Sequence, residues 1–273
     1  MHTLGLQGRK LVLIVMLGLA CSRFVAASDG ASLTKDQIKK FLLTAKVVKS
    51  QRSSKGITSP WRLTLTDGIV THDASFQAVD EHRNRMQFSS GTELAFVDSY
   101  KYNIAAYRLA EMLGVDDMMP VYVERSWGGD SGSLSWWLPV KMDEVERHKQ
   151  NLKAPDAQAW NNQMYRIRVF DELVYDTDAN LTNVLIGEDW KIWRVDFTRA
   201  FRLRKDLKDP SNLVRCDRVL LDKLKILNGN ELAGETKGYL TKDEVKAVMA
   251  RRDKIVAQFE KLIAEKGENE VLY

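Results

Sequence analysis

Three polar side chains in the second half of the chain have the types and the order that phosphoryl transfer from a nucleotide requires. Asp178 is followed five residues later by Asn183, and a second carboxylate, Asp196, ends the next apolar segment. Phosphoryl transfer needs a carboxylate near the attacking hydroxyl and hard oxygen ligands for magnesium. We therefore expect Asp178 to orient or deprotonate an acceptor hydroxyl, and Asn183 and Asp196 to bind Mg²⁺ (or Mn²⁺) together with ATP.

Two short apolar segments, 184–186 and 192–195, lie between these residues, with a turn at 187–189. This pattern predicts a β-hairpin with buried arms, which would hold the polar ends rigidly. Asn180 is expected to support the loop or a metal-bound water. The alternative is that these Asp and Asn residues only form turns, as both residue types often do.

The sequence upstream predicts the elements that must position this hairpin. Residues 61–65 alternate between apolar and polar, which is typical of a half-buried strand. Asp67-Gly68 is a hairpin turn signal, so 69–79 is predicted as the return strand. Thr34 is expected to cap a helix. The other predicted elements are strands at 120–125 and 133–138 around a Gly-rich loop at 128–132, helices from about 35, at 102–113 and at 156–174, and a helical region beyond Pro210 that includes 241–264.

Strands early in the chain and helices later indicate an α+β fold of two lobes. We expect an N-lobe at 28–140, with a helix, a small antiparallel sheet and a second helix. The helical C-lobe is expected at 141–273, and its catalytic loop and metal-binding hairpin at 176–201. The cleft between such lobes is the expected ligand site.

The first 27 residues have the pattern of an export signal. Arg9 and Lys10 precede the apolar segment 11–20, which is too short to span a bilayer as a helix. Cleavage after 25–27 would give a periplasmic or secreted protein, whereas lipidation at Cys21 would anchor it to a membrane. The alternative is a buried N-terminal strand or helix.

Charge and cysteine content exclude several classes of function. Without the three cations of 1–27 the formal net charge falls from +4 to +1, which gives no electrostatic basis for a nucleic-acid partner. The two cysteines are Cys21 and Cys216, and removal or lipidation of Cys21 would leave Cys216 without a partner. A disulfide framework and a Cys-rich metal site are thereby excluded.

Two segments resemble those of atypical kinases. Residues 178–183 and 196–201 are similar to the catalytic loop and metal-binding Asp of HipA-type, Golgi secretory-pathway and phosphatidylinositol kinases. The segment 102–109, followed by Leu113-Gly114, resembles the helix of their N-lobe. The chain also resembles a group of exported bacterial proteins built on this plan. The resemblance implies a kinase-like fold that binds Mg-ATP and a protein, glycan or small-molecule acceptor.

The chain departs from these kinases at one charged pair. They usually place a Lys on the third strand, paired with a Glu of the helix, and Gln77 and Asn103 stand at those positions here. Two neutral amides can hydrogen-bond each other and a phosphate oxygen, so we expect both at the nucleotide. The missing positive charge could come from Lys55, Lys101 or Arg125.

Three functional hypotheses follow. The first is an exported kinase-like phosphotransferase, and the second is a catalytically inactive kinase-fold protein, or pseudokinase, that binds a nucleotide or another ligand. The third is a structural or carbohydrate-binding domain that uses Trp136 or Trp137, because tryptophan rings can stack on sugars.

Overall fold

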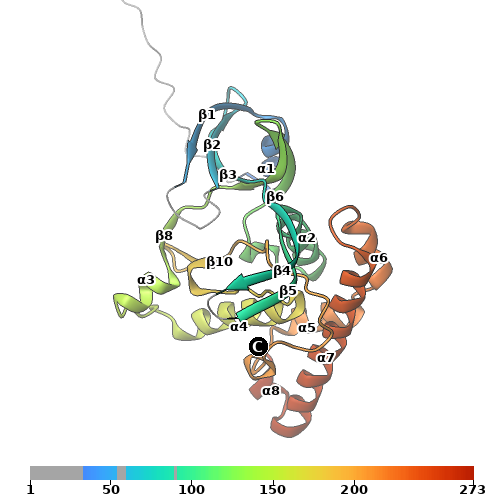
Figure 1. Ribbon diagram of the computed structural model, residues 1–273. Helices are drawn as coiled ribbons and strands as arrows, with labels where there is room; N and C mark the ends of the chain where they lie inside the picture. Colours follow the sequence, from blue (N-terminus) through green and yellow to red (C-terminus); the bar gives the residue numbers. More distant parts are fainter. Residues whose placement is uncertain (1–32, 54–59, 89–90) are drawn as a thin grey trace, which may run out of the picture. The chain divides into compact units, whose positions relative to one another are not determined.

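Five antiparallel strands, in the order β1-β2-β3-β7-β6, form the sheet of the first lobe (Figure 1). The structure is a computed structural model that describes residues 33–53, 60–88 and 91–273, and Thr34–Tyr273 form one compact unit. The predictions for 1–27, for Cys21 and for Lys55 fall outside the described residues. The strands are β1 (Lys46–Arg52), β2 (Trp61–Thr66), β3 (Thr71–Gln77), β6 (Tyr122–Trp127) and β7 (Asp130–Trp136).

One face of this sheet is apolar, as the alternation in β2 predicts. Leu63 and Leu65 of β2 and Phe76 of β3 are buried there. Helix α1 (Lys35–Thr44) packs against β6 and β7, and the ring of Phe41 meets that of Trp136 edge-on at 5.7 Å between centroids. The predicted capping residue Thr34 forms a full capping box at the start of α1.

Helix α2 (Tyr100–Leu113) contacts β6 and β7 and links the sheet to the helices of the second lobe. It ends at Gly114, whose φ of 68° is the left-handed conformation that glycine adopts without strain. Near its start, the hydroxyl of Tyr102 donates to Glu244. The predicted helix and its glycine stop are both confirmed.

A hairpin that the sequence did not predict lies between β3 and α2. Its strands β4 (Asp80–Phe88) and β5 (Gly91–Ser99) form a separate two-stranded sheet (Figure 1). Most β4 side chains are exposed, so the strand lacks the apolar alternation by which a half-buried strand is recognised. The hairpin follows directly on the strand that carries Gln77.

The second lobe combines a small sheet with helices. The predicted hairpin is confirmed as β9 (Val184–Gly187) and β10 (Ile192–Arg194), and β8 (Val140–Asp143) adds an unpredicted third strand beside β9. None of the helices in the described ranges is long and apolar enough to cross a membrane. The remaining helices are α3 (Glu144–Lys149), α4 (Ala157–Val174), α5 (Arg218–Ile226), α6 (Gly229–Glu235), α7 (Lys242–Lys266), α8 (Glu268–Val271) and the short 3₁₀ turns η1 (Asp116–Met118), η2 (Leu181–Asn183) and η3 (Pro210–Asn212).

Cys216 lies in the core, where the chain end packs beside it. Its backbone N–H donates to Val271 O at 2.9 Å and its carbonyl accepts from Tyr273 N at 3.2 Å. Burial raises the pKa of the Cys216 thiol to about 12. Because the thiolate is the reactive species, we expect iodoacetamide to leave Cys216 unmodified in the native protein near pH 8, about the pKa of a free thiol, and to modify it after unfolding. Peptide-resolved mass spectrometry measures this, and alkylation of the native protein at the rate of a free thiol would contradict it.

Candidate active site

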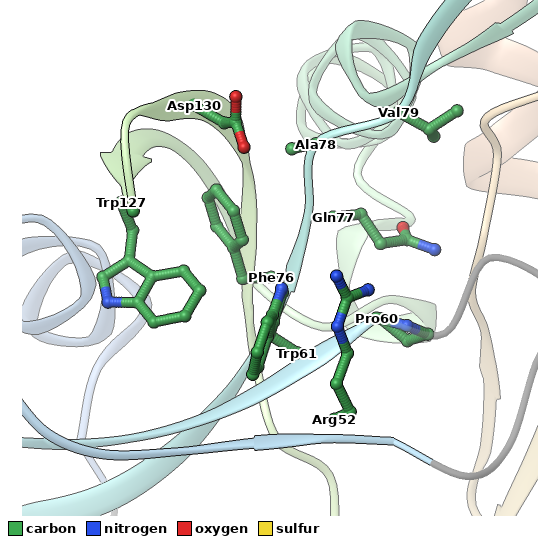
Figure 2. A pocket seen from close by; sticks show the side chains of 10 residues that line it. Arg52, Pro60, Trp61, Phe76, Gln77, Ala78, Val79, Trp127 and Asp130 are labelled. Carbon is green, nitrogen blue, oxygen red and sulfur yellow. The ribbon is translucent and has the colours of Figure 1, made fainter.

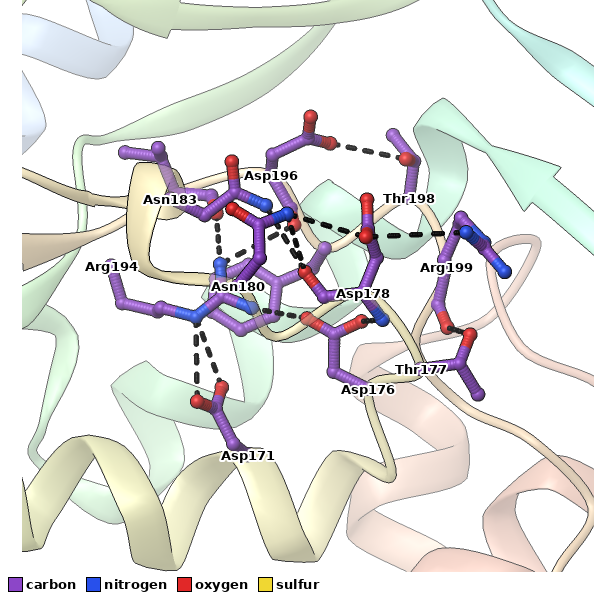
Figure 3. A network of polar contacts seen from close by, with 12 residues as sticks. Asp171, Asp176, Thr177, Asp178, Asn180, Asn183, Arg194, Asp196, Thr198 and Arg199 are labelled. Carbon is purple, nitrogen blue, oxygen red and sulfur yellow. Dashed lines mark hydrogen bonds and ion pairs between the residues drawn. The ribbon is translucent and has the colours of Figure 1, made fainter. Parts of the chain in front are cut away.

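The loop between α4 and β9 presents Asp178 at the surface of the second lobe (Figure 3). Its side chain is 43% exposed, which leaves the carboxylate open to an acceptor. The Asp178 backbone is fixed on both sides: its N–H donates to Asp176 Oδ1 at 2.8 Å, and its carbonyl accepts from Asn180 N at 2.7 Å and from Asn183 Nδ2 at 3.2 Å. The loop is therefore a preorganised support for the Asp178 side chain.

Asn180, an exposed residue, supports the loop by local hydrogen bonds. Its Oδ1 accepts from Thr182 N at 2.9 Å, which caps η2, and its Nδ2 donates to Asp178 Oδ1 at 3.2 Å. The supporting role that we expected for Asn180 agrees with these contacts.

Asn183 precedes β9 and Asp196 follows β10, so both lie at the open end of the hairpin. Val195 N donates to Asn183 O at 3.0 Å, so the two ends are held together by the main chain. Figure 3 shows the carboxamide oxygen of Asn183 and the carboxylates of Asp178 and Asp196 turned to the same side. Asp196 has a φ of 62°, and this left-handed backbone is a strained feature of the kind found at functional sites.

Asp196 is a desolvated carboxylate, and a bound cation would stabilise its charged form. Burial raises the pKa of its carboxyl, and Thr198 Oγ1 donates to its Oδ1 at 3.0 Å. In the described part of the chain, no group of three or more His, Cys, Asp and Glu side chains is placed to hold a metal. A site of one amide and one carboxylate oxygen suits Mg²⁺ or Mn²⁺, which commonly complete their coordination with substrate phosphates and waters.

A buried ion cluster, which we did not predict, lies beneath the loop. The guanidinium of Arg194 is fully buried and pairs with Asp176, which is also buried, and with Asp171 Oδ1 of α4 at 3.1 Å. The same guanidinium donates to the carbonyl of Val195, and at 3.4 Å to that of Asp196 (Figure 3). The feature of the sequence that indicates this cluster is Arg194, a charged residue at the end of the otherwise apolar strand β10.

Gln77 and Asn103 form the hydrogen bond expected between two neutral amides. Asn103 Nδ2 donates to Gln77 Oε1 at 2.8 Å and to Ser133 Oγ at 3.2 Å, and Asn103 Oδ1 accepts from Phe197 N at 2.7 Å. Asn103 is 0% exposed. These contacts use both ends of its carboxamide, so they favour a positioning role for Asn103 over direct contact with a nucleotide. Through Phe197, the helix α2 reaches the residue next to Asp196.

Two of the cations that could replace the missing lysine bind other groups of the protein. Lys101 Nζ pairs with Asp80 at 2.7 Å. Arg125 donates to the carbonyls of Leu42 and Ala45, both at 2.7 Å, which places it against α1. Both contacts argue against a nucleotide-binding role for either side chain.

Two arginines that follow Asp196 in the sequence form ion pairs with the β4–β5 hairpin. Arg199 and Arg202 each pair with Glu93 of β5 at 2.7 Å. Arg199 Nη1 is also 4.0 Å from Asp178 Oδ1. The hairpin therefore packs directly against the segment that follows Asp196.

The tryptophans of the third hypothesis are half-buried and packed. The Trp136 ring stacks on His72, with 3.5 Å between centroids, and Arg62 lies 4.3 Å from the centroid of Trp137. Burial lowers the pKa of His72, and its Nε2 lies 3.0 Å from Trp137 O. These contacts favour structural roles for both rings.

A pocket of about 400 Å³ opens at the end of β3, beside Gln77 (Figure 2). Its wall combines three aromatic rings, three polar or charged side chains and small or aliphatic residues. Its lining consists of Arg52, Pro60, Trp61, Phe76, Gln77, Ala78, Val79, Trp127, Gly128 and Asp130.

Comparison with solved structures identifies the fold. The chain is similar to a hydra Fam20 solved with sugar (TM-score 0.61, 17% identity, 87% of this chain and 91% of that one). It is also similar to the Golgi casein kinase (TM-score 0.60, 14% identity, 87% and 77%) and to the Golgi casein kinase with Mn/ADP bound (0.59, 13%, 87% and 78%). No family model and no curated protein sequence matches the chain. The atypical protein-kinase-like fold that we predicted is thus confirmed, and the similarity to exported bacterial proteins stays a prediction.

Proposed function

We propose that this chain is a kinase-type phosphotransferase that binds ATP with Mg²⁺ or Mn²⁺ and phosphorylates a hydroxyl group. The observation that carries the proposal is the common orientation of Asp178, Asn183 and Asp196 on one loop and hairpin of a kinase-like fold. A structure of similar fold, the Golgi casein kinase, was solved with Mn/ADP. The metal of that structure, Mn²⁺, is a cation that binds hard oxygen donors such as those of the candidate site.

In the proposed reaction the acceptor oxygen forms a bond to the γ-phosphorus and the bond from that phosphorus to the ADP oxygen breaks. The proton of the hydroxyl passes to Asp178, which the loop holds in place and leaves exposed. Asn183 and Asp196 would hold the metal, which supplies positive charge for the phosphate oxygens. The Gln77–Asn103 pair fixes the Phe197 backbone and so the orientation of Asp196.

The proposal also includes the class of the phosphate acceptor and the location of the protein. One similar structure contains a sugar and another is a casein kinase, and both glycans and proteins carry suitable hydroxyls. We propose a protein, glycan or small-molecule acceptor and no nucleic acid. If residues 1–27 act as an export signal, the enzyme is periplasmic or secreted, with a membrane anchor only if Cys21 is lipidated.

A second candidate is a pseudokinase that binds a nucleotide or another ligand without turnover. The neutral pair of Gln77 and Asn103 favours it, because two amides do not supply the charge of a Lys–Glu pair. A pseudokinase that binds a nucleotide shares metal-dependent nucleotide binding with the first candidate, and the two then differ in whether ADP is formed.

Replacement of the proposed base tests catalysis directly. We expect Asp178→Asn to lower the rate of ADP formation from ATP by about 10²–10⁴-fold, the usual contribution of a general base, while nucleotide affinity stays unchanged. ADP is measured with Mg²⁺ and with Mn²⁺, with water, casein and monosaccharides as acceptors. The matched control is Asp189→Asn in the hairpin turn, which should keep the native rate. Nucleotide binding by the native protein without any ADP formation would instead select the pseudokinase.

A further inference from the structure

The β4–β5 hairpin is separate from the main sheet of the first lobe and is attached to the segment that follows Asp196. At the end of β5, Ser99 N donates to Thr198 O at 2.9 Å. Nearer the tip of the hairpin, Glu93 pairs with Arg199 at 2.7 Å. Main-chain and side-chain contacts therefore join the hairpin to the chain beside the candidate active site.

The hairpin holds the guanidinium of Arg199 by charge and by two aromatic rings. Arg199 Nη2 pairs with Glu93 Oε2 at 2.7 Å. The guanidinium carbon lies 4.8 Å from the centroid of the Phe88 ring and 5.3 Å from that of Phe96. A guanidinium within about 6 Å of an aromatic centroid is attracted to the ring. These contacts restrict the positions that the Arg199 side chain can take.

Arg199 also fixes the backbone immediately before Asp178. Its carbonyl oxygen accepts from Thr177 N at 3.2 Å and from Thr177 Oγ1 at 3.1 Å. The side chain of Arg199 and the backbone of the catalytic loop are thereby held at one place, so their separation does not depend on the side chains alone.

The two carboxylate oxygens of Asp178 have different surroundings. Oδ1 accepts from Asn180 Nδ2 at 3.2 Å and lies 4.0 Å from Arg199 Nη1. Within the described residues, no group donates a hydrogen bond to Oδ2. Figure 3 shows one carboxylate oxygen between Asn180 and Arg199, and no dashed line reaches the other. Because the carboxylate torsion of an aspartate is broad and nearly two-fold, contacts on one oxygen determine where the other lies.

From these contacts we infer that the β4–β5 hairpin positions the catalytic base: Glu93 holds Arg199, and Arg199 holds Oδ1 of Asp178 so that Oδ2 receives the proton of the acceptor hydroxyl. The inference rests on the proposed function and assigns positioning residues to it, because Glu93 and Arg199 act through Asp178. Opposite charges attract at 4.0 Å without a direct hydrogen bond, and Asn180 supplies the hydrogen bond from the other side. A base must lie within hydrogen-bond reach of the proton that it takes, so its orientation affects the rate.

A double-mutant cycle tests whether Arg199 acts through Asp178. With the acceptor that gives the highest rate, Arg199→Gln should lower kcat for ADP formation by about 10- to 100-fold, the scale of a base displaced by about 1 Å, while KM for ATP keeps its native value. Arg199→Lys should recover part of kcat, because an ammonium keeps the charge but not the planar geometry of the guanidinium. Glu93→Gln should lower kcat by less than Arg199→Gln does, since the aromatic contacts remain. In the Asp178→Asn background, Arg199→Gln should have no further effect, because the carboxylate that it positions is gone.

The matched control is Arg204→Gln, which removes an exposed arginine from the same segment and should keep the native kcat. A native kcat in Arg199→Gln would overturn the inference. An equal loss of kcat in the Asp178→Asn background would also overturn it, because Arg199 would then act independently of the base. So would a raised KM for ATP at native kcat, which would make Arg199 a nucleotide-binding residue. If the native protein forms no ADP with either metal, the proposed function fails and this role with it, and that result is seen before any variant is made.

Discussion

The Asp196→Asn variant should lose all metal-dependent stabilisation by ATP. In the native protein, ATP with Mg²⁺ or Mn²⁺ at a concentration of 100 times its dissociation constant should stabilise the fold by about 2.7 kcal/mol. Asp196 supplies the only carboxylate of the two proposed metal ligands, and a neutral amide does not offset the charge of the cation. The rate of ADP formation should fall in parallel. Thermal unfolding with and without metal and ATP measures the first effect.

The unliganded variant should unfold at the native temperature or above it. Burial already raises the pKa of Asp196, so its charge opposes folding, and the amide oxygen of an asparagine can still accept from Thr198. The exposed Asp206, which pairs with Lys254, provides the matched control Asp206→Asn. An Asp196→Asn protein that ATP and metal still stabilise by the native amount would remove Asp196 from the metal site.

The predicted parts of the site are those that local sequence determines. The arms of the β9–β10 hairpin are apolar because they are buried, and the turn residues between them mark its reversal. Asp178, Asn183 and Asp196 stand at fixed offsets from those arms. Once the hairpin forms, their proximity follows, so short-range patterns sufficed for the loop and the hairpin.

The unpredicted parts depend on contacts between distant segments. The Arg194 cluster joins β10 to α4, and Asn103 reaches Phe197 across 94 positions of sequence. Neither contact follows from periodicity, since each depends on how the elements pack. The β4–β5 hairpin was missed for a different reason, because its side chains are mostly exposed and polar, and an exposed two-stranded sheet needs no apolar face.

The Arg194→Met variant should lose about 3–5 kcal/mol of the free energy of unfolding. Methionine fills most of the space but leaves Asp176 fully buried and Asp171 largely buried, without their shared cation. An unpaired buried carboxylate is costly, whereas the pair itself can be close to neutral in stability. Chemical denaturation at neutral pH measures the difference.

The exposed pair of Lys254 and Asp206 provides the matched control. Lys254→Met also replaces a cation by methionine. Because the side chains of Lys254 and Asp206 are both exposed to water, the expected loss in the free energy of unfolding is at most about 1 kcal/mol. Neutralising both carboxylates in Arg194→Met, with Asp171→Asn and Asp176→Asn, should recover much of the stability. That recovery would assign the loss to unpaired charge rather than to poor packing. Equal losses in Arg194→Met and Lys254→Met would contradict the buried ion cluster as a support of the loop.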